Sequence, residues 1–312
     1  MNTLFFKYAV EIERTRSITK AAENLFMAQP NLSKAIRELE NELGFTVFER
    51  NSRGVAPTEK GLMFLASARK ILGEMGSIKR LTGGENPERQ SFSVSIPRAS
   101  YIAEGFIRFA RELDSSREVD INIQETSSIQ TVGNVVENRF NLGIIRYQEV
   151  YENYFLDFLD GKDLNHEQLW EFEYLVLMPK AHPLAAAAEI SFCDLKPYIE
   201  IVHGDTVVPY INAADIRYPS PEAVPPKRIY LYERCNQFDL LASLSQTYMW
   251  VSPIPARLLK RYDLVQRKCT FTNNRYRDML IFRKNYRFTA LDKKFLDKAF
   301  EARNDVSLRQ YK

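Results

Sequence analysis

The sequence predicts three consecutive parts: a small helical unit that ends in a two-stranded ribbon, one long helix, and an α/β domain. Apolar residues recur at helical spacing in three short segments between residues 3 and 43. A single amphipathic pattern then continues without a break over residues 59–82. After a stretch rich in glycine and charge at residues 82–91, strand-like and helical segments alternate to the end of the chain, which is typical of an α/β domain.

Three amphipathic helices are expected in the first 43 residues. The first covers residues 3–14, and the second is short and capped by Ser17 or Thr19. The third runs from Gln29 to about Leu43, with Pro30 in its first turn and a glycine directly after its end. These lengths and the tight turn before Gln29 are typical of a helix-turn-helix.

A ribbon and a long helix follow. Residues 45–48 and 55–58 are strand-like and flank a polar turn, which predicts a two-stranded ribbon. A helix is then expected from Thr58 or Glu59 to about Leu81. Its apolar positions at 3, 4, 3 spacing predict a dimerisation seam of two to three heptads, made by Leu65, Ala68, Leu72 and Met75. The alternative is a helix that packs on its own domain.

The remaining residues predict parallel sheets with covering helices. Strands are expected at residues 92–96, 119–125, 142–146, 170–178, 198–203, 229–232 and 249–252, and helices at residues 100–113, 129–139, 236–246 and 290–303. In open α/β folds, ligands bind beyond the carboxyl ends of the strands, where helix N-termini present free amides. The expected pocket therefore lies at those ends.

Composition excludes several classes of protein. The chain has 312 residues, of which 45% are hydrophobic and 27% charged, as in ordinary globular proteins. No run of 18 apolar residues and no secretory leader is found, so a cytoplasmic protein without a membrane span is expected. Three cysteines and three histidines, none at ligand spacing, predict no disulfide framework, no metal and no cofactor.

Charge is unevenly distributed along the chain. The first 82 residues hold 13 Lys and Arg against 9 Asp and Glu, residues 83–259 hold 15 against 25, and residues 260–312 hold 15 against 6. Different segments are therefore expected to meet different partners. A basic segment can bind nucleic acid, but the mild excess at the N-terminus needs a motif to support that interpretation.

The helix from Gln29 to Leu43, followed by a ribbon, predicts a winged helix-turn-helix. A helix fits the major groove and presents its N-terminal side chains to base edges, where Gln and Asn recognise adenine, and Lys and Arg reach guanine or phosphate. The candidate DNA-binding residues are Ser17, Thr19, Gln29, Pro30, Asn31, Ser33, Lys34, Arg37, Arg50, Arg53 and Thr58. The opposite, apolar face of the third helix is expected to pack into the domain.

Motifs in register strengthen this interpretation. The chain carries AAE-x-L at 21–25, QP-x-LS at 29–33, I-x-x-LE-x-ELG at 36–44, FER at 48–50 and T-E-x-G at 58–61. This stretch resembles the N-terminal domain of LysR-type transcriptional regulators. Two positions differ from the usual pattern: Ala28 replaces a Ser or Thr and cannot cap the helix with an oxygen, and Asn31 replaces a small apolar residue.

The resemblance extends past the linker, where VLMPKAHPLA at 176–185 is similar to the effector domain of the same family. It implies an α/β effector domain of two subdomains, similar to type 2 periplasmic binding proteins, with a small ligand between them. The implied domains are 1–58 for DNA binding, 59–82 for the linker helix and 91–312 for the effector domain. Within the last, subdomain I comprises 91–165 and 267–312, and subdomain II comprises 166–266.

A small organic effector, anionic or aromatic, is the expected ligand. Its candidate residues lie at the predicted strand ends: Arg98, Ser100, Tyr101, Thr126, Ser127, Arg146, His203, Cys235 and Asn236. Ser100 is expected to cap a helix, and Arg98 and Arg146 to pair with a carboxylate. Tyr248 and Trp250 replace a glycine-rich turn usual in the family, and either narrow the cleft or belong to the core.

Two other classes of protein are alternatives to a ligand-controlled regulator. An enzyme would need a nucleophile with its base or a metal set, and the chain has no GxSxG, P-loop, GxGxxG or HExxH motif. A solute-binding protein would need an export signal. The expected partners are double-stranded DNA with a pseudo-palindromic operator and a second copy of the chain, since one recognition helix reads only a few base pairs. The family resemblance implies homodimers through the linker helix and homotetramers through the effector domains.

Overall fold

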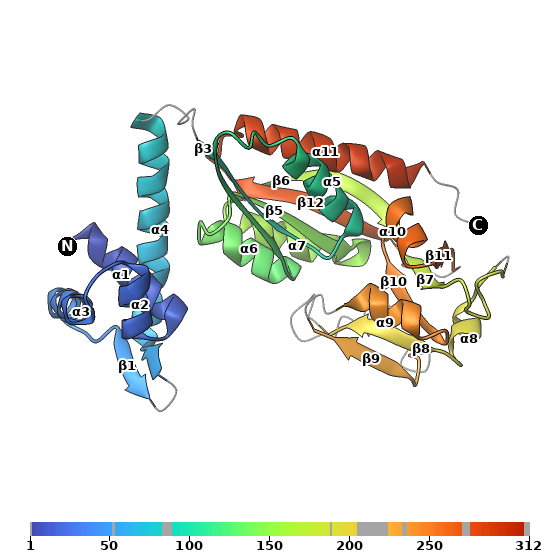
Figure 1. Cartoon of the computed structure of the whole chain (residues 1–312), viewed down its shortest axis with the longest axis horizontal. Helices are drawn as coiled ribbons and strands as arrows, with labels where there is room; N and C mark the ends of the chain where they lie inside the picture. The colour runs from blue at the N-terminus through green and yellow to red at the C-terminus, as the bar shows by residue number, and fades with distance from the viewer. Residues whose placement is uncertain are drawn as a thin grey trace. The chain divides into compact units, whose positions relative to one another are not determined.

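The computed structural model describes residues 2–51, 54–82, 89–187, 189–204, 224–232, 236–269 and 275–308. The chain divides into two compact units (Figure 1). The first is made chiefly of Met1–Pro87, and the second chiefly of Glu88–Val136 and Phe140–Lys312. Both parts of the expected fold class, a winged helix-turn-helix with a long helix and a two-sheet α/β domain, are confirmed.

The first unit contains the three short helices, the ribbon and the long helix. Its elements are α1 (Thr3–Thr15), α2 (Ile18–Asn24), α3 (Gln29–Leu43), β1 (Phe48–Asn51), β2 (Gly54–Pro57) and α4 (Glu59–Thr82). The Ser17 side chain caps α2 by accepting a hydrogen bond from the Lys20 amide at 3.3 Å. Gly44, with φ of 73°, ends α3 in the left-handed conformation that glycine adopts without cost.

The helices of the first unit share one core. Its fully buried members come from four helices and include Phe6, Ala9, Ile12, Ala21, Leu32, Leu39, Leu65 and Ala68. The prediction of a dimerisation seam is therefore wrong for Leu65 and Ala68. Both side chains pack in the core of their own unit, and Leu72 lies partly buried against the same core. Helical spacing predicted correctly that Leu65, Ala68 and Leu72 share one face of α4, but the core of the same unit covers that face.

The second unit contains two five-stranded sheets. One has the strand order β4-β3-β5-β12-β6 and the other β11-β7-β10-β8-β9. The first sheet comprises β3 (Arg89–Ile96), β4 (Glu118–Glu125), β5 (Leu142–Gln148), β6 (Leu164–Glu173) and β12 (Arg275–Arg283), and the second β7 (Leu175–Pro179), β8 (Ile199–His203), β9 (Arg228–Leu231), β10 (Thr247–Val251) and β11 (Leu264–Arg267). Both sheets are mixed: β12 runs antiparallel to β5 and β6, and β7 antiparallel to β10 and β11. The expected parallel pairing is present between β3 and both β4 and β5, and between β8 and both β9 and β10, but each sheet also contains antiparallel strands.

The chain crosses between the sheets at Tyr174. The segment expected as one strand, 170–178, is the end of β6 and most of β7, which belong to different sheets. Because β6 pairs with β12 along its length, residues 164–173 belong to the first subdomain. The expected subdomain boundary at residue 166 is therefore about eight residues too early, since pairing partners far away in sequence determine it.

Helices cover both faces of the first sheet (Figure 1). Helices α5 (Ser100–Arg111) and α11 (Ala290–Ser307) pack on one face, and α6 (Ser128–Val136) and α7 (Glu152–Asp160) on the other. On the face covered by α5 and α11, the rings of Phe109 and Phe295 pack against Phe92, with centroid distances of 4.8 and 5.0 Å respectively. The second sheet is accompanied by α8 (Phe192–Leu195), α9 (Gln237–Ser243) and α10 (Ala256–Arg261).

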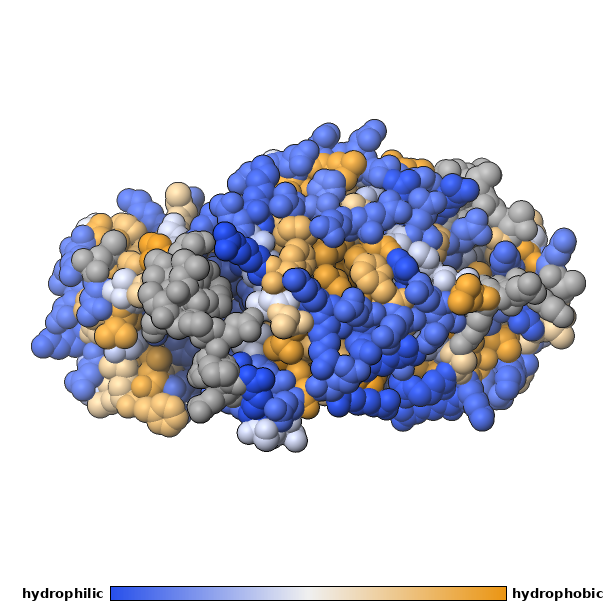
Figure 2. All heavy atoms as spheres, turned by 90° about the horizontal axis from the view of Figure 1, so that it is seen from above, coloured by the Kyte–Doolittle hydropathy of each residue, from blue (hydrophilic) through white to orange (hydrophobic). Residues whose placement is uncertain are grey.

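On the face shown in Figure 2, hydrophilic residues predominate over the second unit, and apolar residues gather in separate patches between them. Within the described ranges, no helix combines the length and apolar character that a membrane crossing needs.

Candidate DNA-binding surface and ligand cleft

The third helix of the first unit separates its side chains by polarity. Leu32, Ile36 and Leu39 are buried in the core of the unit, so the opposite side of α3 faces solvent. The residues on that side are exposed or half-buried: Gln29, Pro30, Asn31, Ser33, Lys34 and Arg37. The structure thus brings these six candidates together at the N-terminal half of one helix, where hydrogen-bonding side chains and two cations are available to a groove.

The N-terminus of α3 lacks a side-chain cap. Ala28 occupies the N-cap position without a side-chain hydrogen bond, as its methyl group requires. The Gln29 side-chain amide instead donates to the Ser33 hydroxyl at 2.8 Å, which holds both side chains along the helix. Uncapped first-turn amides carry the positive end of the helix dipole and favour a phosphate. Lys34 is 79% exposed and lies 3.9 Å from the Glu38 carboxylate.

The remaining DNA-binding candidates are dispersed. Thr19 is exposed at the start of α2. The Thr58 hydroxyl donates to the Thr46 carbonyl at 2.7 Å and accepts from the Gly61 amide at 2.9 Å, so it holds the start of α4. The side chains of Arg50 and Arg53 lie outside the described residues.

Sequence reasoning missed Phe26 in the turn before α3. Its side chain is 98% exposed and its φ is 53°, a conformation that costs a non-glycine residue energy. The signal in the sequence was an apolar residue at a position outside every helical pattern. A large exposed ring next to the helix N-terminus can reach a thymine methyl group or a deoxyribose.

A ligand cleft lies between the two subdomains of the second unit. It has a volume of about 130 Å³. Six of the predicted ligand residues line it: Arg98, Ser100, Thr126, Ser127, Arg146 and His203. They come from the carboxyl ends of β3, β4, β5 and β8 or the residues just after them, as the α/β rule predicts.

Arg146 is not available to an anionic ligand. Its guanidinium donates to both carboxylate oxygens of Asp278 on β12, each at 2.7 Å, and to the Ser252 hydroxyl at 3.1 Å. The side chains of Arg146 and Asp278 are 7% and 0% exposed. Burial lowers the pKa of Arg146, but the Asp278 charge outweighs burial and raises it, so the ion pair persists. The expectation that Arg146 pairs with a ligand carboxylate is wrong because β12 supplies the carboxylate.

Tyr101 and Ser100 differ from what the sequence predicted for them. Tyr101 is buried, and its hydroxyl donates to Asp278 at 2.5 Å, so it supports the ion pair from behind and does not line the cleft. Burial raises the pKa of Tyr101 well above its ordinary value. Ser100 is the first residue of α5, and Ala99 occupies the N-cap, so the expectation that Ser100 caps this helix is wrong.

The other candidates lie elsewhere. Asn236 lines a second pocket and not the cleft. Cys235 lies outside the described residues. Of the two bulky residues on β10, Tyr248 belongs to the buried core of the second subdomain, whereas Trp250 is buried and also lines the cleft.

The cleft is richer in aromatic and neutral polar groups than the sequence suggested. Tyr174 and Tyr276 stack with ring centroids 3.9 Å apart, and both line it. Tyr147 and Gln237 also line it, and their buried Oη and Oε1 atoms have no hydrogen-bond partner among the described residues. Burial raises the pKa of Tyr147 to about 12, so its hydroxyl remains a donor. Tyr276 was missed because no strand was expected at residues 275–283, where β12 lies.

Among the described residues, no group of three or more His, Cys, Asp or Glu side chains could hold a metal ion. Cys269 is buried, and burial raises the pKa of its thiol to about 12. Cys193 is exposed. The histidines show no shared site: His182 accepts a hydrogen bond from the Leu184 amide, and His203 lines the cleft.

A winged helix-turn-helix joined to a two-subdomain ligand-binding domain defines the class of ligand-responsive DNA-binding proteins. Two family models match the chain: "Bacterial regulatory helix-turn-helix protein, lysR family" at residues 5–62 and "LysR substrate binding domain" at residues 108–262. The chain belongs to the LysR family of bacterial regulators.

Individual relatives are transcriptional regulators. The chain is 29% identical over 215 residues to the HTH-type transcriptional regulator CysB of Burkholderia cenocepacia, covering 66% of this chain and 64% of that protein. It is 31% identical over 151 residues to a probable cat1 operon transcriptional activator of Acinetobacter lwoffii, covering 45% and 47%. The matched part thus spans less than two thirds of the length of these curated relatives.

Solved structures share the fold over almost the whole chain. A full-length OxyR variant from Pseudomonas aeruginosa superimposes with a TM-score of 0.62 at 19% identity, covering 97% of this chain and 94% of that one. CbnR, a LysR family transcriptional regulator, superimposes with a TM-score of 0.62 at 14% identity, covering 97% and 99%.

Proposed function

We propose that the chain is a transcriptional regulator, not an enzyme, that binds a specific DNA sequence through the N-terminal half of α3. The observation that carries the proposal is the division of α3 into a buried apolar face and a solvent-facing row of Gln29, Asn31, Lys34 and Arg37. A structural neighbour of 15% identity and TM-score 0.60, full-length CbnR, was crystallised with its target DNA. As a DNA-binding regulator, the chain would act in the cytoplasm.

The proposed control is a small organic molecule in the cleft between the subdomains. The charge of Arg146 is already balanced by Asp278, so the proposal of an aromatic ligand rests on the aromatic residues of the lining. Stacked Tyr174 and Tyr276 offer aromatic faces, and the Tyr147 hydroxyl offers a donor. A ligand that touches both subdomains changes the population of their arrangements, and through it DNA binding or bending.

We further propose that the functional form is a homodimer or homotetramer on a pseudo-palindromic operator. The functional segments would be 1–58, 59–82 and an effector domain within 91–312. Among the described side chains of α4, the apolar ones exposed to a second copy are Leu62, Met63 and Ile71, which are 51%, 71% and 41% exposed. They replace the buried Leu65 and Ala68 as candidates for the contact.

The test is a fluorescence-anisotropy titration with DNA fragments that the wild-type chain retains from a genomic library. Lys34→Ala and Arg37→Ala are each expected to weaken binding by about 1–3 kcal/mol if the side chain contacts a base. Lys162→Ala, which removes an exposed cation of the second unit, is the matched control and should leave affinity unchanged. Wild-type affinity in both α3 variants would refute the assignment of α3 as the recognition helix.

A further inference from the structure

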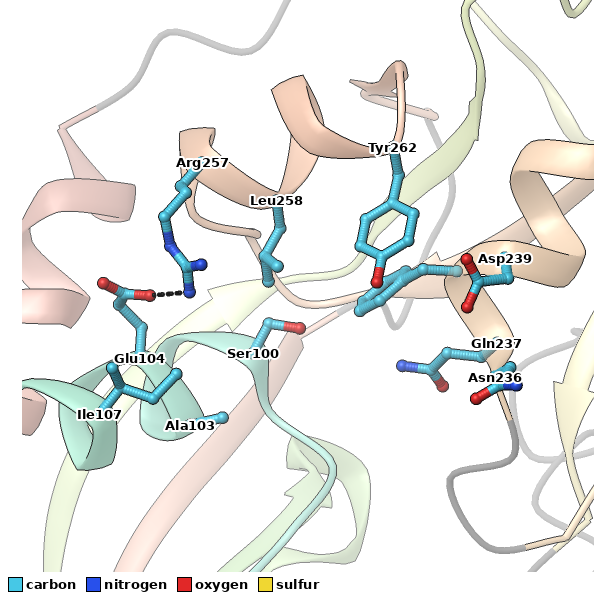
Figure 3. Close-up of a pocket in the computed structure, with 11 residues that line it drawn as sticks. Ser100, Ala103, Glu104, Ile107, Asn236, Gln237, Asp239, Arg257, Leu258 and Tyr262 are labelled. Atoms are coloured by element: carbon cyan, nitrogen blue, oxygen red, sulfur yellow. Dashed lines mark hydrogen bonds and ion pairs between the residues drawn. The ribbon is translucent and has the colours of Figure 1, made fainter. Parts of the chain in front are cut away.

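A second pocket lies beside the cleft, between helices of the two subdomains (Figure 3). It is a groove of about 360 Å³, lined by α5 from one subdomain and by α9, α10 and their flanking residues from the other. Ser100, Gln237 and Phe238 line both this groove and the cleft, so the two cavities share one wall. Of the described residues that the sequence proposes for the effector, Ser100 and Asn236 line the groove.

The lining of the groove is rich in hydrogen-bond acceptors. Glu104 is 8% exposed, and its carboxylate accepts from Arg257 at 2.8 Å across the groove, as the dashed line in Figure 3 shows. The positive charge of Arg257 is therefore already balanced by Glu104. Asp239 is exposed and forms no ion pair with any residue the structure describes, so the lining retains one negative charge.

A buried acceptor also lacks a partner. Gln237 is 5% exposed, and its Oε1 accepts no hydrogen bond from the described residues. In Figure 3 its side chain extends from α9 toward Ser100, into the groove. An amide oxygen that is buried without a hydrogen-bond donor is destabilising, so a ligand that donates to it is favoured.

Aromatic rings complete the site. Phe238 and Tyr262 lie with ring centroids 5.4 Å apart at 37°, and both line the groove together with Ile107 and Leu258. The faces of such rings attract a cation. Their edges and the two aliphatic side chains can pack against the hydrocarbon part of a ligand.

We propose that this groove is a second ligand site that binds a small organic ammonium ion. The ammonium group donates hydrogen bonds to Gln237 Oε1 and interacts with the Asp239 carboxylate, while its hydrocarbon part lies against Phe238 and Leu258. Because the groove joins α5 to α9 and α10, such a ligand holds one arrangement of the two subdomains. Occupancy of the groove therefore alters the affinity of the cleft for its own ligand, and the reverse holds by linkage.

The experiment is isothermal titration calorimetry of the full chain without DNA. The probes are n-butylammonium chloride, sodium butyrate and 1-butanol at equal ionic strength. Saturable binding is expected for the ammonium ion, with the butyrate and the alcohol weaker by at least about tenfold. Asp239→Asn should weaken ammonium binding about three- to fivefold, and Gln237→Met about three- to tenfold.

The control is Asp157→Asn, which neutralises an exposed helical aspartate on α7, outside the groove, and should change ammonium binding by less than about twofold. Equal binding of butyrate and butylammonium, no saturable binding of the ammonium ion, or equal losses in Asp157→Asn and Asp239→Asn would each overturn the proposal. Because DNA is absent, none of these outcomes bears on the role of α3.

Discussion

The ion pair of Arg146 and Asp278 is buried and links β5 to β12 within the second unit. Asp278→Asn removes the charge and keeps the shape of the side chain. The guanidinium of Arg146, whose side chain is 7% exposed, is then left without its counter-charge beside β12. Tyr101 can still donate to the new amide oxygen, and Ser252 still accepts from Arg146. The amide NH2 group cannot accept a hydrogen bond, so the variant loses the charge interaction and one of the two guanidinium hydrogen bonds.

The expected loss of stability is large. Breaking a buried ion pair by removing one partner costs about 3–5 kcal/mol. For a unit of this size, 1 kcal/mol shifts the melting temperature by about 2–4 °C, so Asp278→Asn should melt about 6–20 °C lower. The chain has two tryptophans, Trp170 and Trp250, and both lie in the second unit. Tryptophan fluorescence during urea unfolding therefore reports the free energy of that unit.

The triple variant Tyr101→Phe with Arg146→Met and Asp278→Leu is the matched control, because leucine would leave the buried Tyr101 hydroxyl without its acceptor. It removes both charges, so it should lie much closer to the wild type than the single variant does. The single variant should also gain affinity for benzoate, because Arg146 becomes available to a carboxylate. A loss below about 1 kcal/mol in Asp278→Asn would mean that the pair is not the strong buried interaction its geometry implies.

Three further predictions concern stability. Phe26→Asn should raise the free energy of unfolding of the first unit by about 0.5–1 kcal/mol, because asparagine tolerates the positive φ and the phenylalanine ring is exposed. Thermal melting followed by circular dichroism checks this, and a lower melting temperature in the variant would contradict it. Burial lowers the pKa of His182 in the folded chain, so near the ordinary histidine pKa of 6.5 the unfolded chain binds a proton more readily than the folded chain does. The free energy of unfolding should therefore fall as the pH drops from about 7.5 to about 5.5. Urea titrations at several pH values check this, and His182→Gln should remove the contribution of His182 to that fall. Gly105→Ala should lower the free energy of unfolding by about 1–3 kcal/mol, since the new Cβ would lie 2.7 Å from the Ala299 Cα. Gly133→Ala is the control and should cause no loss, because nothing lies within 4 Å of its new Cβ. Equal melting temperatures of the two variants would refute the close approach of α5 to α11.

Local signals predicted the first unit well. The expected bounds of α3, Gln29 and Leu43, agree with the structure, because Pro30 suits a first turn and Gly44 adopts the left-handed conformation directly after the helix. The polar face of α3 followed from the same periodicity. What covers an apolar face does not follow from periodicity: the spacing of Leu65 and Ala68 predicted one face of α4, and only the fold shows that the core of the same unit covers it.

The sequence by itself determined that the chain joins a winged helix-turn-helix unit to an α/β domain with a pocket at its strand ends, because capping, helical period and strand-helix alternation are local properties. Tertiary structure alone decided the character of that pocket. Arg146 meets Asp278 across 132 positions of sequence, and β12 pairs with β6 to set where the chain crosses at Tyr174. Such pairings arise when distant strands become neighbours in a sheet, and no local pattern encodes which carboxylate will neutralise which guanidinium.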